Sequence, residues 1–213
     1  MLEVKMKMGR LFVEKSALLR NLKAELEKTF KGDLWLFPRG NSEKAVRYFE
    51  KDLGKGVMGF WGTGEKSNSD DVIMIVAERP SAGRQNKPKE FDKTLARFYG
   101  FLEKKELSNS HVTDFIKTRA RTGYDWKKPQ KLEFYEKEFD QHLPFLKKEL
   151  DIIKPNKIIA LGEKTYLWVA ICKSFFKLKE VELFHAPHYA NRFKKQKEFE
   201  KEFLTSIDAL KHT

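Results

Sequence analysis

The sequence has few of the features that tie a chain to a membrane, a disulfide framework or a metal site. Among its 213 residues there is one cysteine, Cys172, so an intrachain disulfide and any site with four cysteine ligands are excluded. Apolar runs stay far shorter than the ~20 residues that cross a bilayer. The first residues lack the charge, apolar core and cleavage site of a signal peptide. We therefore expect a soluble, cytoplasmic protein in which Cys172 is a small core residue.

Acidic residues are too few to balance the basic ones. The chain has 43 Lys and Arg against 31 Asp and Glu, which gives a formal net charge of +12. Clustered cations favour an anionic partner because they release the counterions condensed on a phosphate backbone. The segment 117–131 has six basic residues, one acid, and the aromatic residues Tyr124 and Trp126. Such a loop is typical of contacts with single-stranded or extruded nucleotides; the alternative is a solvated surface.

Short apolar runs alternate with helical periodicity over most of the chain. With 40% hydrophobic and 13% aromatic residues, the chain can bury a sizeable core. The predicted strands are 72–77, 111–116, 157–161 and 181–185. The predicted helices are 14–30, 92–105, 132–153, 163–177 and 194–211, with Pro144 kinking or breaking the third. This alternation favours right-handed crossovers and therefore a three-layer α/β/α domain around a four-stranded parallel sheet.

The N-terminal residues 1–69 do not continue this pattern. After the helix predicted at 14–30 they contain a short aromatic and apolar stretch and a glycine-rich run. We expect a helical and irregular extension that packs on the α/β domain formed by residues 70–213. The high content of Lys together with Glu is typical of hyperthermophile proteins and suggests a thermophilic source.

Polar residues follow each predicted strand at its carboxyl end. In an open parallel sheet these ends lie at one edge, where ligands bind. The polar clusters are 78–84, 113–119, 162–165 and 185–189. Carboxylates, histidines and cations at one edge therefore predict a site. The five histidines show no ligand spacing with cysteine or paired acids, so no metal is expected.

The order of these clusters resembles the uracil-DNA glycosylase superfamily, and above all its thermostable family-4 enzymes. Those enzymes have Gly-Glu-Ala-Pro-Gly after the first strand, Thr-Asn in the second, Ala-Leu-Gly at the third and a His-Pro-Ser-type motif after the fourth. The corresponding motifs here are Ala-Glu-Arg-Pro-Ser at 77–81, Thr-Asp at 113–114, Ala-Leu-Gly at 160–162 and His-Ala-Pro-His at 185–188. The resemblance covers residues 70–195 and implies the three-layer fold of that superfamily.

The resemblance implies a monofunctional DNA glycosylase of base excision repair, which flips an abnormal base out of DNA and hydrolyses its N-glycosidic bond. It assigns two roles to Glu78, namely to orient the attacking water and to stabilise oxocarbenium-like charge on the sugar. It assigns the hydrogen bond to the base oxygen O2 to either His185 or His188. Phe91 then stacks on the base and Asp114 reads its edge. The further implied DNA contacts are Arg84, Lys117, Arg119, Arg121, Lys164, Tyr189 and Arg192. The expected partner is DNA and not a membrane, bound by a monomer at a prokaryotic nucleoid.

Two departures from the family bear on the chemistry. The cysteines that hold the iron–sulfur cluster of family 4 are missing, so no cofactor is expected. Asp114 stands where the family has an asparagine. An ionised carboxylate only accepts hydrogen bonds, which suits a base with an exocyclic amine, whereas a protonated one restores the donor that uracil needs. A third interpretation is a structural ion pair of Asp114 with Lys117 or Arg119.

Two other functions compete with the glycosylase. The altered motifs favour a nucleic-acid-binding protein that keeps the fold without catalysis, whereas the retention of Glu78 together with His185 favours an enzyme. A nuclease that uses Asp70, Asp71 and Glu78 with a divalent ion is disfavoured. These acids lie at opposite ends of a strand of about six residues at ~3.3 Å each, which is too far apart to share one metal.

Overall fold

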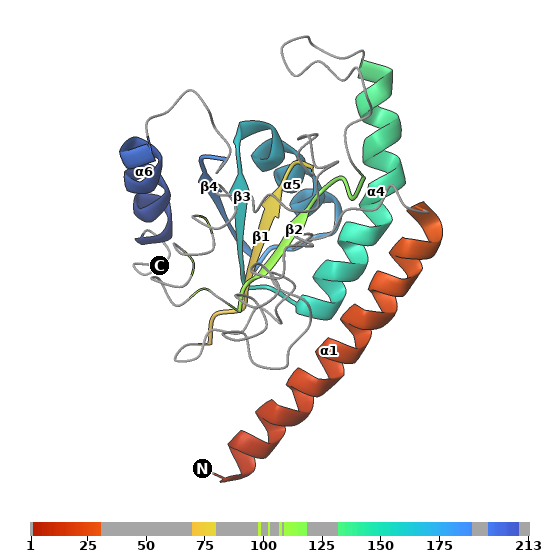
Figure 1. The fold of residues 1–213 in the computed structure, drawn as a ribbon, viewed down its shortest axis with the longest axis vertical. Coiled ribbons are helices and arrows are strands. Elements are labelled where there is room, and N and C mark those ends of the chain that lie inside the picture. Colours follow the sequence, from red (N-terminus) through yellow and green to blue (C-terminus); the bar gives the residue numbers. More distant parts are fainter. Residues whose placement is uncertain are drawn as a thin grey trace, which may run out of the picture.

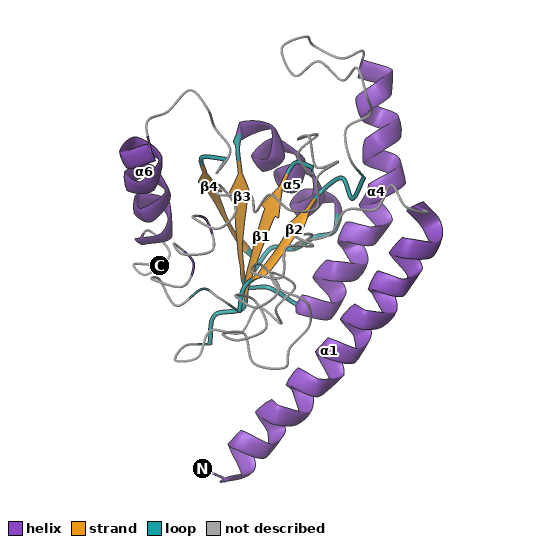
Figure 2. Ribbon diagram, in the orientation of Figure 1, coloured by secondary structure: helices purple, strands orange, loops and turns teal. Residues whose placement is uncertain are grey.

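The computed structural model describes residues 2–30, 70–79, 109–118, 132–188 and 196–208, together with positions 98, 102 and 107. A sheet lies at the centre with helices on both faces (Figures 1 and 2). The elements in chain order are α1 (Leu2–Phe30), β1 (Ile73–Ala77), β2 (His111–Asp114), α4 (Leu132–Ile153), β3 (Lys157–Leu161), α5 (Glu163–Phe175), β4 (Glu182–Ala186) and α6 (Gln196–Asp208). The predicted three-layer architecture with a central parallel sheet is confirmed.

The four strands run parallel in the order β2-β1-β3-β4. All five residues of β1 are buried and apolar, as expected for a strand with a neighbour on each side and helices above and below. From β1 the chain first winds outward to β2 and then returns past β1 to β3. The direction of winding therefore reverses between β1 and β3. In such sheets the ligand crevice forms outside the carboxyl ends at this reversal.

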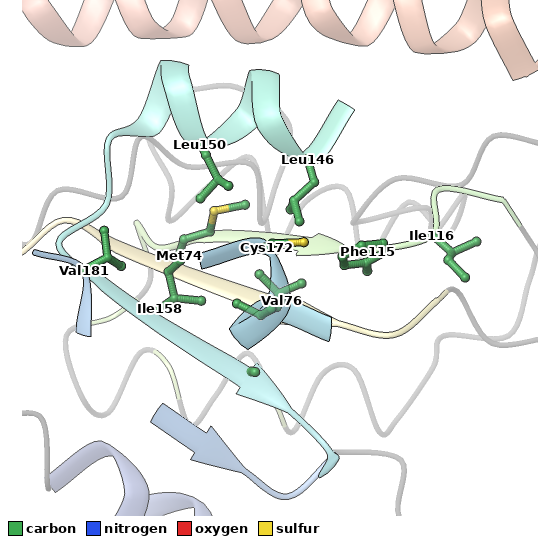
Figure 3. Packing of buried hydrophobic residues seen from close by; sticks show 11 residues of the cluster. Met74, Val76, Phe115, Ile116, Leu146, Leu150, Ile158, Cys172 and Val181 are labelled. Atoms are coloured by element: carbon green, nitrogen blue, oxygen red, sulfur yellow. The ribbon is translucent and has the colours of Figure 1, made fainter. Parts of the chain in front are cut away.

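One face of the sheet packs against α4 and α5 (Figure 3). Because side chains alternate along a strand, Met74 and Val76 of β1 point to the same face. They form a buried cluster with residues of the two helices, among them Leu146, Leu150, Val169 and Cys172. Burial raises the pKa of the Cys172 thiol to about 12. Cys172 is therefore an inert core residue, as the sequence predicts.

Two further helices cover the outside of this unit. α1 packs on α4 and not on the sheet, with Leu22 and Leu26 facing Phe145 of α4. On the opposite face of the sheet, α6 contacts β4. Its Phe203 is fully buried and meets the ring of Phe98 edge-on, with 5.5 Å between the ring centroids. None of the described helices combines the length and the apolar character needed to span a bilayer.

Some element boundaries differ from the predicted ones. α1 begins at Leu2 and not at residue 14, and β2 ends at Asp114, two residues before its predicted end. α4 continues through Pro144 without a break. Pro144 is exposed, so the carbonyl that loses its helical partner there can bond to water. After α5 the chain reverses at Lys177, whose φ of 56° lies in the left-handed region.

Candidate functional site

The carboxyl ends of the four strands lie at one edge of the sheet (Figure 1). The amide of Phe115 donates to the carbonyl of Ala77 at 2.7 Å, which fixes the exit of β2 beside that of β1. The amide of Gly162 donates to the carbonyl of Ala186 at 2.7 Å and fixes the exit of β3 beside that of β4. Four of the predicted site residues are thereby brought to the same edge: Glu78, Asp114, Lys164 and His188.

Glu78 directly follows β1 and is held by two cations. Lys164 Nζ, from the first turn of α5, donates to Glu78 Oε1 at 2.7 Å, and Arg79 Nε lies 3.8 Å from the same oxygen. No described residue hydrogen-bonds the other oxygen, Oε2. The Lys164 ammonium also lies over the ring of Trp168, 4.8 Å from its centroid. Glu78 is thus an oriented carboxylate with one oxygen left for a water or a substrate.

Arg79 connects this edge of the sheet to α4. Its side chain is fully buried, and both terminal nitrogens bond to the carboxylate of Glu138, one of them at 3.2 Å. A bidentate contact of this kind fixes the position of both side chains. Arg79 therefore anchors the exit of β1 to a helix, and does not present its charge at the surface.

Asp114 ends β2 with a buried carboxyl group. The residue is 2% exposed, and neither carboxyl oxygen has a hydrogen-bond partner among the described residues. Burial raises the pKa of Asp114 well above its usual value; Lys117 opposes the shift, while Glu149 and Glu78 add to it. The environment therefore favours the neutral acid. Glu78 therefore lies close enough to Asp114 to disfavour a negative charge on it.

Lys117 is the centre of a buried polar cluster and not a surface cation. Its side chain is 0% exposed, and its ammonium donates to Thr113 Oγ1 and to the backbone oxygen of Asp114, both at 2.6 Å. It also forms an ion pair with Glu149 Oε1 of α4 at 2.6 Å. The expectation that Lys117 contacts DNA is thus corrected, because the three donors of its ammonium are already taken by Thr113, the backbone of Asp114 and Glu149. Lys117 also bonds the backbone of Asp114 and not its carboxyl group.

Two histidines border this cluster. His111 Nε2 lies 3.3 Å from Glu149 Oε2. Burial by itself raises the pKa of Glu149, but Lys117 and His111 lower it overall, so the carboxylate stays charged. On α4, His142 Nδ1 accepts a hydrogen bond from the backbone amide of Lys117 at 3.4 Å. Burial, with Lys117 and Arg79 adding to it, lowers the pKa of His142 to about 3, so this ring is neutral.

The two histidines of the last motif occupy different places. His185 is exposed, meets the ring of Tyr166 edge-on at 5.6 Å, and lines an open groove of about 520 Å³ beside α6. His188 packs over the turn after β3, where a Cβ added to Gly162 would lie 3.6 Å from the Cβ of His188. Burial lowers the pKa of His188 to about 4, and Glu78 opposes the shift. His188 thus lies within electrostatic reach of Glu78, whereas His185 faces the groove.

Sequence reasoning missed the acids that support the site. Glu138 and Glu149, both on α4, hold the two buried cations that follow β1 and β2. A signal for Glu149 is present in the sequence, because it lies three residues after Leu146 on the apolar face of a helix, where an acid needs a buried partner. The predicted site residues that lie outside the described residues are Arg84, Phe91, Arg119, Arg121, Tyr189 and Arg192.

Comparison with known families agrees with the four motifs. The model of the Uracil DNA glycosylase superfamily matches residues 64–211, well over half of the chain. No curated protein matches the chain significantly. The matched range includes all the strand-end residues described above, and it leaves out α1.

Proposed function

Because the chain belongs to the uracil DNA glycosylase superfamily, we propose that it is a monofunctional DNA glycosylase that hydrolyses a flipped, abnormal base from DNA. One observation carries the proposal. The strand ends gather an oriented carboxylate, a buried acid and a neutral histidine at the edge where α/β sheets bind ligands. The net charge of +12 further supports a polyanionic substrate.

In the proposed reaction, Glu78 orients a water molecule for attack on C1′ of the flipped nucleotide. Lys164 and Arg79 both approach Oε1, so Oε2 is the oxygen that accepts a hydrogen bond from the water. The water oxygen bonds to C1′, the bond from C1′ to the base nitrogen breaks, and a water proton is transferred to the departing base. The negative charge of Glu78 also stabilises the oxocarbenium-like sugar.

The same contacts support hydrolysis without strand cleavage by the enzyme. A lyase step needs an amine with a free lone pair that attacks C1′ and forms a Schiff base. The described amine next to Glu78 is that of Lys164, which donates to the carboxylate as an ammonium. An ammonium has no lone pair for this attack, so water is the nucleophile that the site favours.

We assign the contact with the base oxygen O2 to His188 and not to His185. Negative charge builds up on the base as it leaves, and a hydrogen bond from a ring N–H to O2 stabilises that charge. Because burial lowers the pKa of His188 to about 4, its imidazole is neutral at pH 7 and still has one N–H to donate. His185 lies beside α6, where it lines a separate groove.

The remaining contacts are proposed from the family resemblance. Phe91 stacks on the extruded base, Asp114 reads its edge, and Tyr189 enters the duplex with the loop that follows β4. Lys164 is partly exposed, so the ammonium that holds Glu78 also faces the incoming DNA. The cations proposed to meet phosphates are Arg84, Arg119, Arg121 and Arg192.

A metal-dependent nuclease has less support. Asp71 pairs with Lys157 Nζ at 3.2 Å before β1, at the end of the strand opposite to Glu78. Asp71 and Glu78 therefore lie at different edges of the sheet, which is too far apart for them to bind one metal ion.

An abasic-site assay tests the proposed function. Labelled oligonucleotides, single- and double-stranded, each carry one uracil, hypoxanthine, xanthine, cytosine, 5-methylcytosine or adenine, and hot alkali cleaves any abasic site that forms. We expect product from at least one base, lost in Glu78→Gln while DNA binding is kept. The matched control is Glu163→Gln, an exposed acid on the first turn of α5. DNA binding with no product from any base would instead favour the non-catalytic binding protein.

A further inference from the structure

We propose that Asp114 reads the flipped base as a neutral carboxylic acid, and that the site therefore accepts bases with a carbonyl edge and bases with an amino edge. The inference rests on the proposed function and concerns its substrate class. It starts from the carboxyl group at the end of β2, in which neither oxygen is hydrogen-bonded by a described residue. Buried polar groups in proteins nearly always have partners, so an unpartnered carboxyl group at a ligand-binding edge indicates that its partner is the ligand.

The neighbouring cations are occupied by other acceptors. The ammonium of Lys117 donates to two oxygens of β2, one of them the backbone oxygen of Asp114, and pairs with Glu149. The terminal nitrogens of Arg79 bond to Glu138. Neither cation hydrogen-bonds the carboxyl oxygens of Asp114.

Charges from two other elements act against ionisation. Glu78 after β1 and Glu149 on α4 both disfavour a negative charge on Asp114, whereas Lys117 and Arg79 favour it. A buried charge without hydrogen bonds is avoided in proteins by keeping the group protonated. The direction of the pKa shift of Asp114, upward with burial as its largest cause, agrees with the geometry.

A neutral acid pairs with either kind of base edge. It has one O–H donor and one acceptor oxygen, and the proton can reside on either oxygen because no described residue fixes it. Facing uracil or hypoxanthine, it donates to the carbonyl and accepts from the ring N–H. Facing cytosine or adenine, it accepts from the amino group and donates to the ring nitrogen. An ionised Asp114 has two acceptors, and one of them repels an oxygen or nitrogen lone pair in both cases.

Binding to uncleavable DNA separates base reading from bond cleavage. The probes are oligonucleotides with a 2′-fluoro nucleotide, in which the fluorine disfavours the oxocarbenium-like sugar. They carry uracil, cytosine or a nonpolar isostere of the same shape without a hydrogen-bonding edge. We expect the full-length protein to bind the uracil and the cytosine probe each about 10–100-fold more tightly than the isostere. Asp114→Leu should bring all three affinities together, whereas the control Asp140→Asn, an exposed acid on α4, should leave them unchanged.

The pH dependence gives a second readout on the native protein. If Asp114 reads as a neutral acid, both preferences over the isostere decrease when the pH is raised past the elevated pKa of Asp114, because the carboxyl group then ionises. Asp114→Asn, which has a donor and an acceptor at every pH, should keep a pH-independent preference. The comparison of the native protein with Asp114→Asn tests the inference even where Asp114→Leu does not fold.

Two results would overturn the inference. One is a preference over the isostere for only one of the two bases. The other is a preference that neither Asp114→Leu nor rising pH reduces. Failure of the proposed function is a separate result, since it would be the absence of abasic product from every cleavable oligonucleotide, whatever the uncleavable probes show.

Discussion

The buried cluster around Lys117 allows a stability prediction that can be worked from the structure. The side chains of Lys117 and Glu149 are both 0% exposed, and Lys117 Nζ lies 2.6 Å from Glu149 Oε1. Lys117→Met keeps an unbranched side chain but leaves the carboxylate of Glu149 buried without its cation. The change also removes the donor to Thr113 Oγ1 and to the backbone oxygen of Asp114.

The expected loss of stability in Lys117→Met comes mainly from the uncompensated charge of Glu149. Removing one partner of a buried ion pair costs about 3–5 kcal/mol, because the other charge stays buried and uncompensated. The two lost hydrogen bonds contribute about 1 kcal/mol each. Because the same ammonium makes all three contacts, part of this contribution is already included in the cost of removing one partner of the ion pair. We expect Lys117→Met to lower the free energy of unfolding by about 4 kcal/mol. Lys117→Met combined with Glu149→Gln removes the uncompensated charge and should restore about half of that loss.

Urea unfolding at pH 7, followed by circular dichroism, measures these differences. The matched control is Lys147→Met, which breaks the exposed ion pair with Asp151 on the same helix and should cost less than about 0.5 kcal/mol. Two outcomes would refute the reasoning: a cost below about 1 kcal/mol for Lys117→Met, or a double variant no more stable than the single one.

Three further predictions follow from single residues. The pKa of Asp114 is raised on folding, so this group lowers the free energy of unfolding as the pH rises from the usual carboxyl range toward the raised value. Urea unfolding between pH 4 and 8 should therefore show a smaller decline in that free energy for Asp114→Asn than for the native protein. Equal declines would contradict the prediction. Because burial raises the pKa of Cys172 to about 12, a thiol reagent at pH 8 should label it only after unfolding, and rapid labelling of the native protein would argue against its place in the core. Gly162 has a φ of 91°, so Gly162→Ala should lower the free energy of unfolding by at least about 1 kcal/mol, measured by urea denaturation; an unchanged stability would show that the turn relaxes.

The fold could be predicted from the sequence because its signals are local. β1 is a short, continuously apolar run, β3 is apolar after its first residue Lys157, and α5 follows Gly162 directly. The alternation of strand and helix is therefore visible without tertiary information. The start of α1 and the end of β2 were missed. The first residues of α1 lack a helical spacing of apolar residues, because Leu2, Val4, Met6 and Met8 lie at every second position. Phe115 and Ile116 are apolar and buried although they lie beyond the strand.

The site could be predicted only in part. Glu78 and Asp114 were placed together because the topology of a parallel sheet brings strand ends to one edge, whatever the side chains do. The direction of Lys117 could not be predicted in the same way. A lysine after a strand looks the same in the sequence whether its ammonium is in solvent or beside a buried acid. Only the packing of α4, which brings Glu149 over the exit of β2, decides between them.

The buried ion pairs explain how this edge keeps its geometry. A cation follows β1 and another follows β2, and each pairs with an acid of α4: Arg79 with Glu138 and Lys117 with Glu149. Glu78 directly precedes Arg79, and Asp114 lies three residues before Lys117. These are the two carboxyl groups that we propose contact the substrate. Since backbone and side-chain contacts of the cations fix the exits of both strands, α4 acts as their support. Substitutions of these two α4 acids should therefore alter catalysis by displacing Glu78 or Asp114, although neither acid is proposed to contact the DNA.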